Sequence, residues 1–348
     1  MRRVLPSSWS SSVIALLVLI TTSAHAVEFP GPDPGPATAT RVGEAYVGLA
    51  NHAIRATWSA SGGRLVPATL RDELSGTDLE PARELFVLEF QDGTRLAASR
   101  MHANPCTIED VAPDTGAVIA ADRIAGKRLR AVLVSSDGAL RVRWSATLRD
   151  GASYVRQEIA IEPVTRDADV ARIVMVDHWL TGGDVVGRVS GSPIVAGSLF
   201  TGLEHPMATS QVEDGGTPRL VPAPGSDDGP LAPDAPTAQT VTPTARWGRA
   251  HVRSWLELSL PLPRGRSFVL SSVTGTAPPG QMRRAFLCYV ERERAHPYRT
   301  FLHYNSWYDI GYFTRYDQKD ALGAIERYGE ELARKRGVTL DSFLFDDG

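Results

Sequence analysis

Short apolar runs with a period of two residues are the feature that most limits how this chain can fold. Such runs occupy residues 86–90, 129–134, 140–144, 154–161, 171–176, 251–260 and 268–273, and Gly, Asp and Ser separate many of them. In one run, Leu140, Val142 and Trp144 share one face of a strand, and arginines occupy the other. Many short strands with tight turns predict a large β-sandwich over residues 45–297.

The pattern changes after residue 297. Residues 300–304 are typical of a strand, Asp317 suits the N-cap of a helix, and Gly337 suits the position just past its end. A second apolar strand follows over residues 342–345. Strand, helix and strand predict one βαβ unit with a parallel pair. We expect residues 298–348 to be the truncated start of a second domain, since two parallel strands cannot cover their own faces.

Two segments precede these two domains, and a third interrupts the β-sandwich. Residues 1–26 resemble a signal peptide, with Arg2 and Arg3, a short apolar run and the cleavage site Ala24-His25-Ala26. A membrane anchor is the alternative, but the apolar run is shorter than the roughly 20 residues that span a bilayer. We therefore expect a periplasmic or secreted protein, with a linker over residues 27–44 and a disordered insertion over about 209–245.

Composition argues against several classes of partner. The formal net charge is −3 and charged residues make up 22%, so we expect no nucleic-acid partner. No second apolar stretch is long enough to span a membrane after signal cleavage. The two cysteines, Cys106 and Cys288, cannot build a thiolate zinc site, and no histidine cluster has metal-ligand spacing. We expect no metal or cofactor. The sequence does not decide whether the two cysteines form a disulfide.

The residues that follow the two predicted parallel strands suggest a binding site. Asn305 and Trp307 follow the first strand, and Asp346 and Asp347 follow the second. Functional sites gather at the carboxyl ends of parallel strands. An aromatic face stacks on the C–H face of a sugar, and carboxylates accept hydrogen bonds from its hydroxyls. Taken singly, the tryptophan also suits a core and the aspartates a solvated turn.

Asp346 and Asp347 do not suit the catalytic pair of a glycosidase. Such a pair flanks one scissile bond with its carboxyl groups at least about 5 Å apart. Neighbours on a strand point to opposite faces, so binding of hydroxyls is the better role. His205, in Glu204-His205-Pro206, is a weaker candidate, because a loop histidine bonded to the backbone explains it as well. Residues 177–179 are interpreted as a turn rather than a sugar contact.

The motifs Asn305-Ser306-Trp307 and Asp346-Asp347-Gly348 resemble the start of the catalytic barrel in α-galactosidase-like glycoside hydrolases, families 36 and 27 of clan D. Larger members of that group place a β-supersandwich, similar to galactose mutarotase, before a (β/α)8 barrel. The resemblance implies that Asp346 and Asp347 hold ring hydroxyls in the first sugar subsite and that Trp307 lines it. It also implies that the nucleophile and the acid/base are aspartates on later strands. We therefore place no catalytic residue in this chain.

The sequence thus predicts the N-terminal part of an exported retaining α-glycosidase that acts on α-linked oligosaccharides or glycoconjugates. The expected substrate-binding residues are Asp346, Asp347, Trp307, Asn305 and His205, and the chain alone is expected to be inactive. The alternative is a non-catalytic carbohydrate-binding β-sandwich protein. Further aspartates at the ends of additional βα units would distinguish the enzyme from the binding protein.

Overall fold

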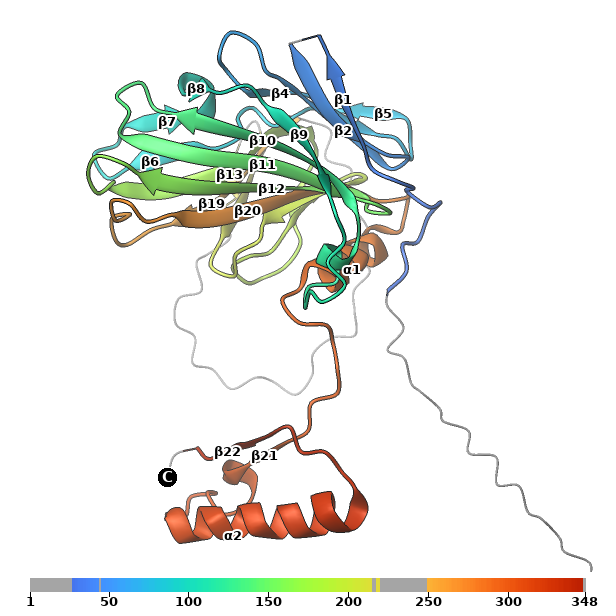
Figure 1. Ribbon diagram of the computed structural model, residues 1–348, viewed down its shortest axis with the longest axis vertical. Coiled ribbons are helices and arrows are strands. Elements are labelled where there is room, and N and C mark those ends of the chain that lie inside the picture. Colours follow the sequence, from blue (N-terminus) through green and yellow to red (C-terminus); the bar gives the residue numbers. More distant parts are fainter. Residues whose placement is uncertain (1–26, 44, 215–216, 220–248, 347–348) are drawn as a thin grey trace, which may run out of the picture. The chain divides into compact units, whose positions relative to one another are not determined.

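Backbone hydrogen bonds arrange the strands into three antiparallel sheets and one parallel pair (Figure 1). The computed structural model describes residues 27–43, 45–214, 217–219 and 249–346. It divides them between two compact units, one reaching to Pro297 and the other starting at Tyr298. The expected signal peptide, Asp347, and residues 215–216 and 220–245 of the expected insertion lie outside the described residues.

The larger unit is mostly β and resembles a supersandwich. A five-stranded sheet runs β1–β5: Thr38–Val42, Tyr46–Ala50, Ile54–Ser59, Val66–Asp72 and Thr77–Leu79. A six-stranded sheet has the order β18-β17-β19-β13-β6-β7: Thr217–Arg219, Thr209–Asp214, Arg249–Glu257, Val170–Thr181, Val87–Phe90 and Arg95–Ala97. A nine-stranded sheet contacts both of these sheets. Its order is β14-β15-β16-β20-β12-β11-β10-β8, with β9 also paired to β10: Asp184–Val185, Ile194–Ala196, Leu199–Leu203, Phe268–Thr276, Tyr154–Pro163, Leu140–Arg149, Gly126–Val134, His102–Ala103 and Thr107–Val111.

One apolar core joins the three sheets of the larger unit. Leu140, Val142 and Trp144 of β11 are buried, as the alternation of the sequence predicts. The ring of Trp144 meets Trp58 of β3 edge to face, with centroids 5.4 Å apart, so the nine-stranded and five-stranded sheets share this core. The other face of β11 carries Arg141 and Arg143, which form ion pairs with Glu162 on the neighbouring strand.

Two expected irregular segments contain strands instead. β1 lies inside the expected linker and pairs with β2 from Thr38↔Ala50 to Val42↔Tyr46. β17 begins at residue 209, where the expected insertion began, and pairs with β19. The Pro- and Gly-rich composition of these segments concealed the strands, because pairing with a neighbouring strand overrides weak local preference. Asp177 and His178, interpreted as part of a turn, lie buried within β13 for the same reason.

A helix that the sequence pattern did not reveal, α1 (Met282–Glu293), covers one end of the nine-stranded sheet. Tyr289 of α1 packs edge to face on Tyr154 of β12, at 5.0 Å between centroids. Phe286 meets Phe200 of β16 in the same way at 5.4 Å. Gly275 of β20 lies beneath these rings, and a Cβ there would lie 2.2 Å from the Phe200 ring. A side chain at this position would push the aromatic layer off the sheet.

Polar groups under α1 are paired with one another. The Tyr289 hydroxyl donates to Glu204 Oε1 at 2.8 Å, and Arg156 Nε donates to Glu204 Oε2 at 2.5 Å. The Tyr154 hydroxyl donates to Glu293 Oε1 at 2.8 Å. These bonds satisfy charges that would otherwise be costly to bury, so the network fixes α1 on the sheet. Both cysteines of the larger unit, Cys106 and Cys288, are buried free thiols.

The smaller unit contains the predicted strand, helix and strand. β21 (His303–Asn305) and β22 (Ser342–Leu344) pair in parallel, from His303↔Ser342 to Asn305↔Leu344. Between them, α2 (Gln318–Tyr328) starts at a capping box: Asp317 accepts from the N–H groups of Lys319 and Asp320, and the Asp320 carboxylate accepts from Asp317 N. The described part of the chain contains the helices α1 and α2, a π-helical continuation of α2 over Gly329–Arg334, and three short 3₁₀ turns, so no barrel is evident in it.

No helix in the described residues combines the length and the apolar character needed to cross a membrane.

Candidate functional site

The two parallel strands bring three of the five predicted site residues together. Asn305 ends β21, Trp307 lies in the short 3₁₀ turn Ser306–Tyr308 directly after it, and Asp346 lies two residues past the end of β22. Parallel pairing places these chain segments at the same edge of the pair. Asp347, the fourth residue, follows Asp346 but lies outside the described residues.

Ser306 ties the two strand ends to each other. Its side chain is fully buried, accepts from Asp346 N at 2.9 Å and donates to Asp346 O at 3.3 Å. The Tyr316 hydroxyl donates to the same carbonyl at 3.0 Å. Asp346 therefore has a fixed backbone while its side chain is exposed. Within the described residues its carboxylate accepts no hydrogen bond, which leaves it available to a ligand.

Asn305 orients the turn that carries the tryptophan. Its Oδ1 accepts from Trp307 N at 2.8 Å, as an N-cap does, and so fixes the first turn after β21. Its neighbour Tyr304 packs beneath the site against Phe343 and Phe345 and donates its hydroxyl to Asp309 Oδ2 at 2.9 Å. Burial, together with that bond to a carboxylate, raises the pKa of Tyr304 to about 12.

Trp307 is half-buried and belongs to an aromatic cluster. Its ring meets Tyr312 and Phe313 edge to face, at 6.0 and 5.5 Å between centroids. Phe313 is 82% exposed and has φ +53°, the only positive φ of a described residue other than glycine. Aromatic residues seldom adopt this region, and the strain costs on the order of 1–3 kcal/mol. Strain of this kind gathers at binding sites, where the surrounding structure maintains it.

His205, the fifth predicted residue, belongs to the larger unit and follows β16. Its Nδ1 accepts from Met207 N at 3.1 Å, so the side chain stabilises its own turn. The preceding Glu204 is bonded to Arg156 and Tyr289 beneath α1. The arrangement explains both residues as structural, and sugar binding by His205 stays a prediction. Among the described residues, no group of His, Cys, Asp and Glu is arranged to hold a metal ion.

The larger unit has a hollow that the sequence analysis did not identify as a site. It lies on the face of the nine-stranded sheet opposite the core and is lined by four arginines, Arg128, Arg130, Arg143 and Arg156. The available signal was the alternation of basic residues with apolar ones in residues 126–131 and 140–144. Alternation predicts an exposed face but does not tell which strands become neighbours.

No protein-family model matches the chain, and no curated protein matches it. Among solved structures, it aligns with the galactosidase domain of an α-galactosidase–sucrose kinase at 10% identity and TM-score 0.42, covering 79% of this chain and 47% of that one. It aligns with a GH36 α-galactosidase of Geobacillus stearothermophilus at 12% identity and TM-score 0.40, covering 90% and 50%. It aligns with an α-N-acetylgalactosaminidase of Bifidobacterium bifidum at 13% identity and TM-score 0.36, covering 85% and 48%. The chain thus spans about half the length of these proteins, and likeness at these scores assigns it no function.

Proposed function

We propose that this chain supplies the sugar-binding part of an exported retaining α-glycosidase that acts on α-galactosides or related α-linked sugars. The observation that carries the proposal is the placement of Asn305, Trp307 and Asp346 at one edge of a parallel strand pair. In this role the Trp307 ring stacks on the C–H face of a sugar ring, and the Asp346 carboxylate accepts hydrogen bonds from its hydroxyls. Asp347 is proposed to accept from a neighbouring hydroxyl.

The chemistry of bond cleavage is proposed to come from other carboxylates. A retaining glycosidase needs a nucleophile and a proton donor about 5–5.5 Å apart on opposite sides of the scissile bond. Asp346 and Asp347 are sequence neighbours and cannot flank a sugar ring in that way. The role of Asp346 is therefore to hold the sugar so that the transition state, with its oxocarbenium character, is bound more tightly than the substrate.

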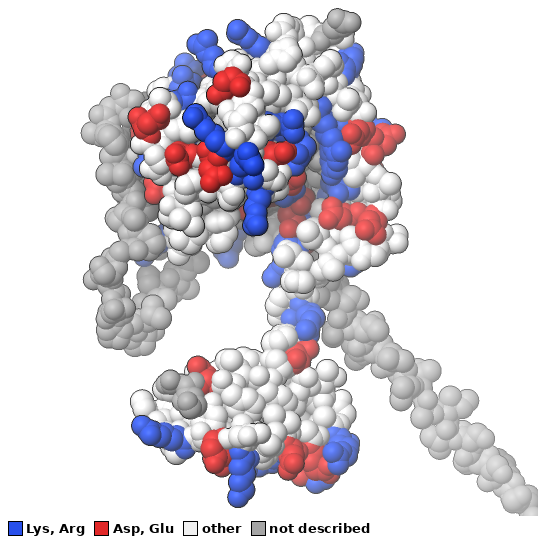
Figure 2. Space-filling view, turned by 60° about the vertical axis from the view of Figure 1, so that its left-hand side comes forward, with Lys and Arg blue, Asp and Glu red and all other residues white. Residues whose placement is uncertain are grey.

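The exposed apolar surface of the smaller unit supports a place for it in a (β/α)8 barrel. Leu322 and Ile325 on α2 and Leu344 on β22 are 50%, 38% and 44% exposed. Figure 2 shows that the face of this unit turned to the viewer is largely free of charged side chains, which gather along one rim. In a barrel, neighbouring strands and helices cover such surfaces. The motif resemblance of residues 305–307 and 346–348 supports the same placement.

Hydrolysis of p-nitrophenyl α-D-galactopyranoside by the protein that contains this chain tests the proposal. We expect turnover with release of the α-anomer first, observed by proton NMR, and no turnover of the β-galactoside. The non-catalytic carbohydrate-binding alternative predicts binding of galactosides without turnover. If the protein neither binds galactosides nor hydrolyses them, the proposed function is refuted.

Asp346→Asn provides the residue-level test. Loss of a charge-assisted hydrogen bond to the sugar is expected to weaken transition-state binding by about 2–4 kcal/mol, or roughly 30- to 900-fold in kcat/KM. Glu326→Gln, at an exposed position on α2, is the matched control and should change kcat/KM little. Equal kcat/KM for Asp346→Asn and wild type would remove Asp346 from the site.

Export is proposed from the signal-like residues 1–26. Mass spectrometry of the protein recovered from the periplasm or the medium should show Val27 as the first residue. Retention of residues 1–26 in the exported protein would contradict this.

A further inference from the structure

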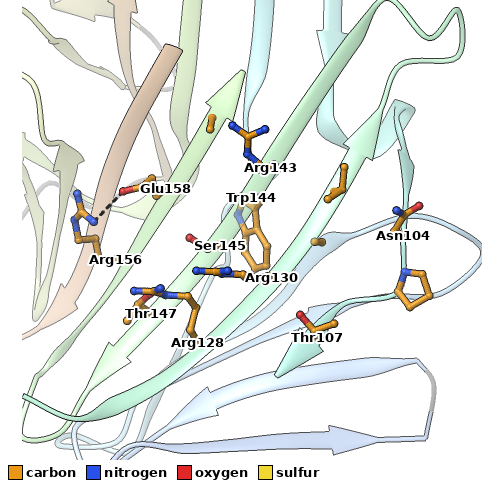
Figure 3. A pocket seen from close by; sticks show the side chains of 14 residues that line it. Asn104, Thr107, Arg128, Arg130, Arg143, Trp144, Ser145, Thr147, Arg156 and Glu158 are labelled. Atoms are coloured by element: carbon orange, nitrogen blue, oxygen red, sulfur yellow. Dashed lines mark hydrogen bonds and ion pairs between the residues drawn. The ribbon is translucent and has the colours of Figure 1, made fainter. Parts of the chain in front are cut away.

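Side chains of three neighbouring strands form most of the arginine-lined hollow of the larger unit. The hollow is open to solvent, has a volume of about 570 Å³, and lies over β10, β11 and β12 on the face of the nine-stranded sheet away from the core. Side chains that alternate along these strands point into it, and strand register places them in rows. Arg128, Thr147 and Arg156 form one row, and Arg130, Ser145 and Glu158 form the next (Figure 3).

Most of the charged groups in this hollow already have partners. Arg130 Nε lies 3.2 Å from Glu109 Oε2, and Arg143 Nη1 lies 3.0 Å from Glu162 Oε2. Arg156 is shared between Glu158, at 3.2 Å, and Glu204, at 2.5 Å. The carboxylates around the hollow are therefore engaged with these three arginines.

Arg128 is the exception. It is half-buried, its Nε donates to Thr147 Oγ1 at 3.0 Å, and it forms no ion pair with any described residue. Burial, and then the neighbouring cations Arg130 and Arg149, lower the pKa of its guanidinium, and the nearby carboxylates of Glu109 and Glu158 oppose this shift only in part. A partly buried arginine that no carboxylate contacts directly is unfavourable, and a bound anion reduces that cost.

Neutral donors complete the lining. The Ser145 hydroxyl, the Thr107 hydroxyl and the Asn104 amide line the same hollow, and none of them hydrogen-bonds to another described side chain. Figure 3 shows Arg128 and Arg130 over Thr147 and Ser145, with Asn104 and Thr107 across the hollow. A planar guanidinium flanked by hydroxyl and amide donors matches the geometry of an oxyanion with several acceptor oxygens.

We propose that the hollow over β10, β11 and β12 binds the oxyanion group of a small acidic molecule, with Arg128 as the central ligand. The group is a sulfate, a phosphate or a carboxylate, held by the two free Nη atoms of Arg128 and by the donors of Asn104, Thr107 and Ser145. This site is distinct from the edge of the parallel strand pair, and it does not depend on the proposed glycosidase function.

The test is isothermal titration of the full chain at low ionic strength with three probes: inorganic sulfate, inorganic phosphate and D-galacturonate. D-galactose serves as the neutral control. We expect saturable binding of at least one anion, and the probe bound most tightly identifies the class of oxyanion. Arg128→Gln should weaken that binding by about tenfold or more, and Arg128→Lys, which keeps the charge but loses the forked donors, by less.

Arg141→Gln is the matched control, because Arg141, on β11, lies on the same face of the nine-stranded sheet as Arg128, pairs with Glu162 and does not line the hollow. Thermal unfolding adds a readout that a purely structural arginine would not give. Without anion, Arg128→Gln should be as stable as wild type or more stable, because an unpaired cation is removed. With the binding anion, only wild type and Arg141→Gln should gain additional stability.

Three results would overturn the proposal. They are the absence of saturable binding of any probe to wild type, unchanged binding by Arg128→Gln, or an equal loss in Arg128→Gln and Arg141→Gln. General stabilisation by sulfate appears equally in all variants, so only a gain that differs between Arg128→Gln and the other two proteins counts as binding.

Discussion

Glu293 shows how a single residue links the packing of α1 to pH. Its carboxyl group is largely covered, with 15% of the side chain exposed, and it accepts from the Tyr154 hydroxyl. Burial raises the pKa of Glu293 above its ordinary value of 4.5, and the nearby Glu204 adds to the effect, while Tyr154 and Arg156 oppose it. The folded protein therefore binds this proton more tightly than the unfolded chain does.

The sign of the pH effect follows from that shift. As pH rises from the unfolded value toward the raised folded value, the contribution of Glu293 to stability falls, and above the folded value it is constant. Glu293→Gln keeps an acceptor for Tyr154 and cannot ionise. Its free energy of unfolding should rise relative to wild type as the pH increases above 4.5. Urea unfolding from pH 4 to 8 measures this, with Glu291→Gln on the same helix as control, and a constant or falling difference would contradict it.

The candidate site was predictable from sequence at the level of residues but not of contacts. Asn305, Trp307 and Asp346 were found because each follows a predicted strand of one βαβ unit. Ser306, which ties the strand ends together, and Phe313, with its strained backbone, carry no local signal. The role of Ser306 depends on its bond to a segment 40 residues away, which no local pattern encodes.

At the scale of elements, the alternation of apolar and polar residues predicted the strands that bury one face and expose the other. β10, β11 and β12 follow the alternation closely because their core faces are apolar and their other faces are polar. α1 was missed because charged residues crowd its sequence: Arg283, Arg284, Glu291, Arg292 and Glu293. Tertiary contacts stabilise this helix instead: its aromatic rings pack on Tyr154 and Phe200, and Tyr289 donates a hydrogen bond to Glu204.

The capping box of α2 is an element that sequence reasoning located to the residue. Asp317 was predicted as the N-cap, and its carboxylate accepts from the N–H groups of Lys319 and Asp320 at 2.8 and 3.1 Å. Asp317→Ala should destabilise α2 by about 1 kcal/mol, the usual effect of losing such a cap. Hydrogen exchange of the α2 amides measures the change, and Gln318→Ala in the same turn is the control. Unchanged exchange in Asp317→Ala would show that packing alone holds the first turn.

At the scale of the whole molecule, the two units differ in how they are stabilised. The larger unit has one core shared by three sheets, whereas the smaller has a pair of three-residue strands and one helix with exposed apolar residues. Domains with separate cores open independently, and regions with little buried apolar surface open most easily.

Hydrogen exchange across the chain should therefore separate the two units. Amides of β10, β11 and β12 should exchange only by opening of the whole larger unit, and amides of β21, β22 and α2 should exchange much faster. Addition of urea should accelerate the two sets at different concentrations. Equal and strong protection in both would show that the smaller unit is stabilised by more than its own contacts.

The central claim is that the edge of the parallel strand pair binds a sugar. Titration with methyl α-D-galactopyranoside, followed through the Trp307 indole N–H in ¹H–¹⁵N spectra, tests it most directly. The resonance is assigned by its absence in Trp307→Phe. We expect a saturable shift with a dissociation constant of about millimolar order, weakened roughly tenfold or more by Asp346→Asn. The shift should be retained in Tyr308→Ala, whose side chain is 85% exposed. No saturable shift, or one that Asp346→Asn leaves unchanged, would contradict the account.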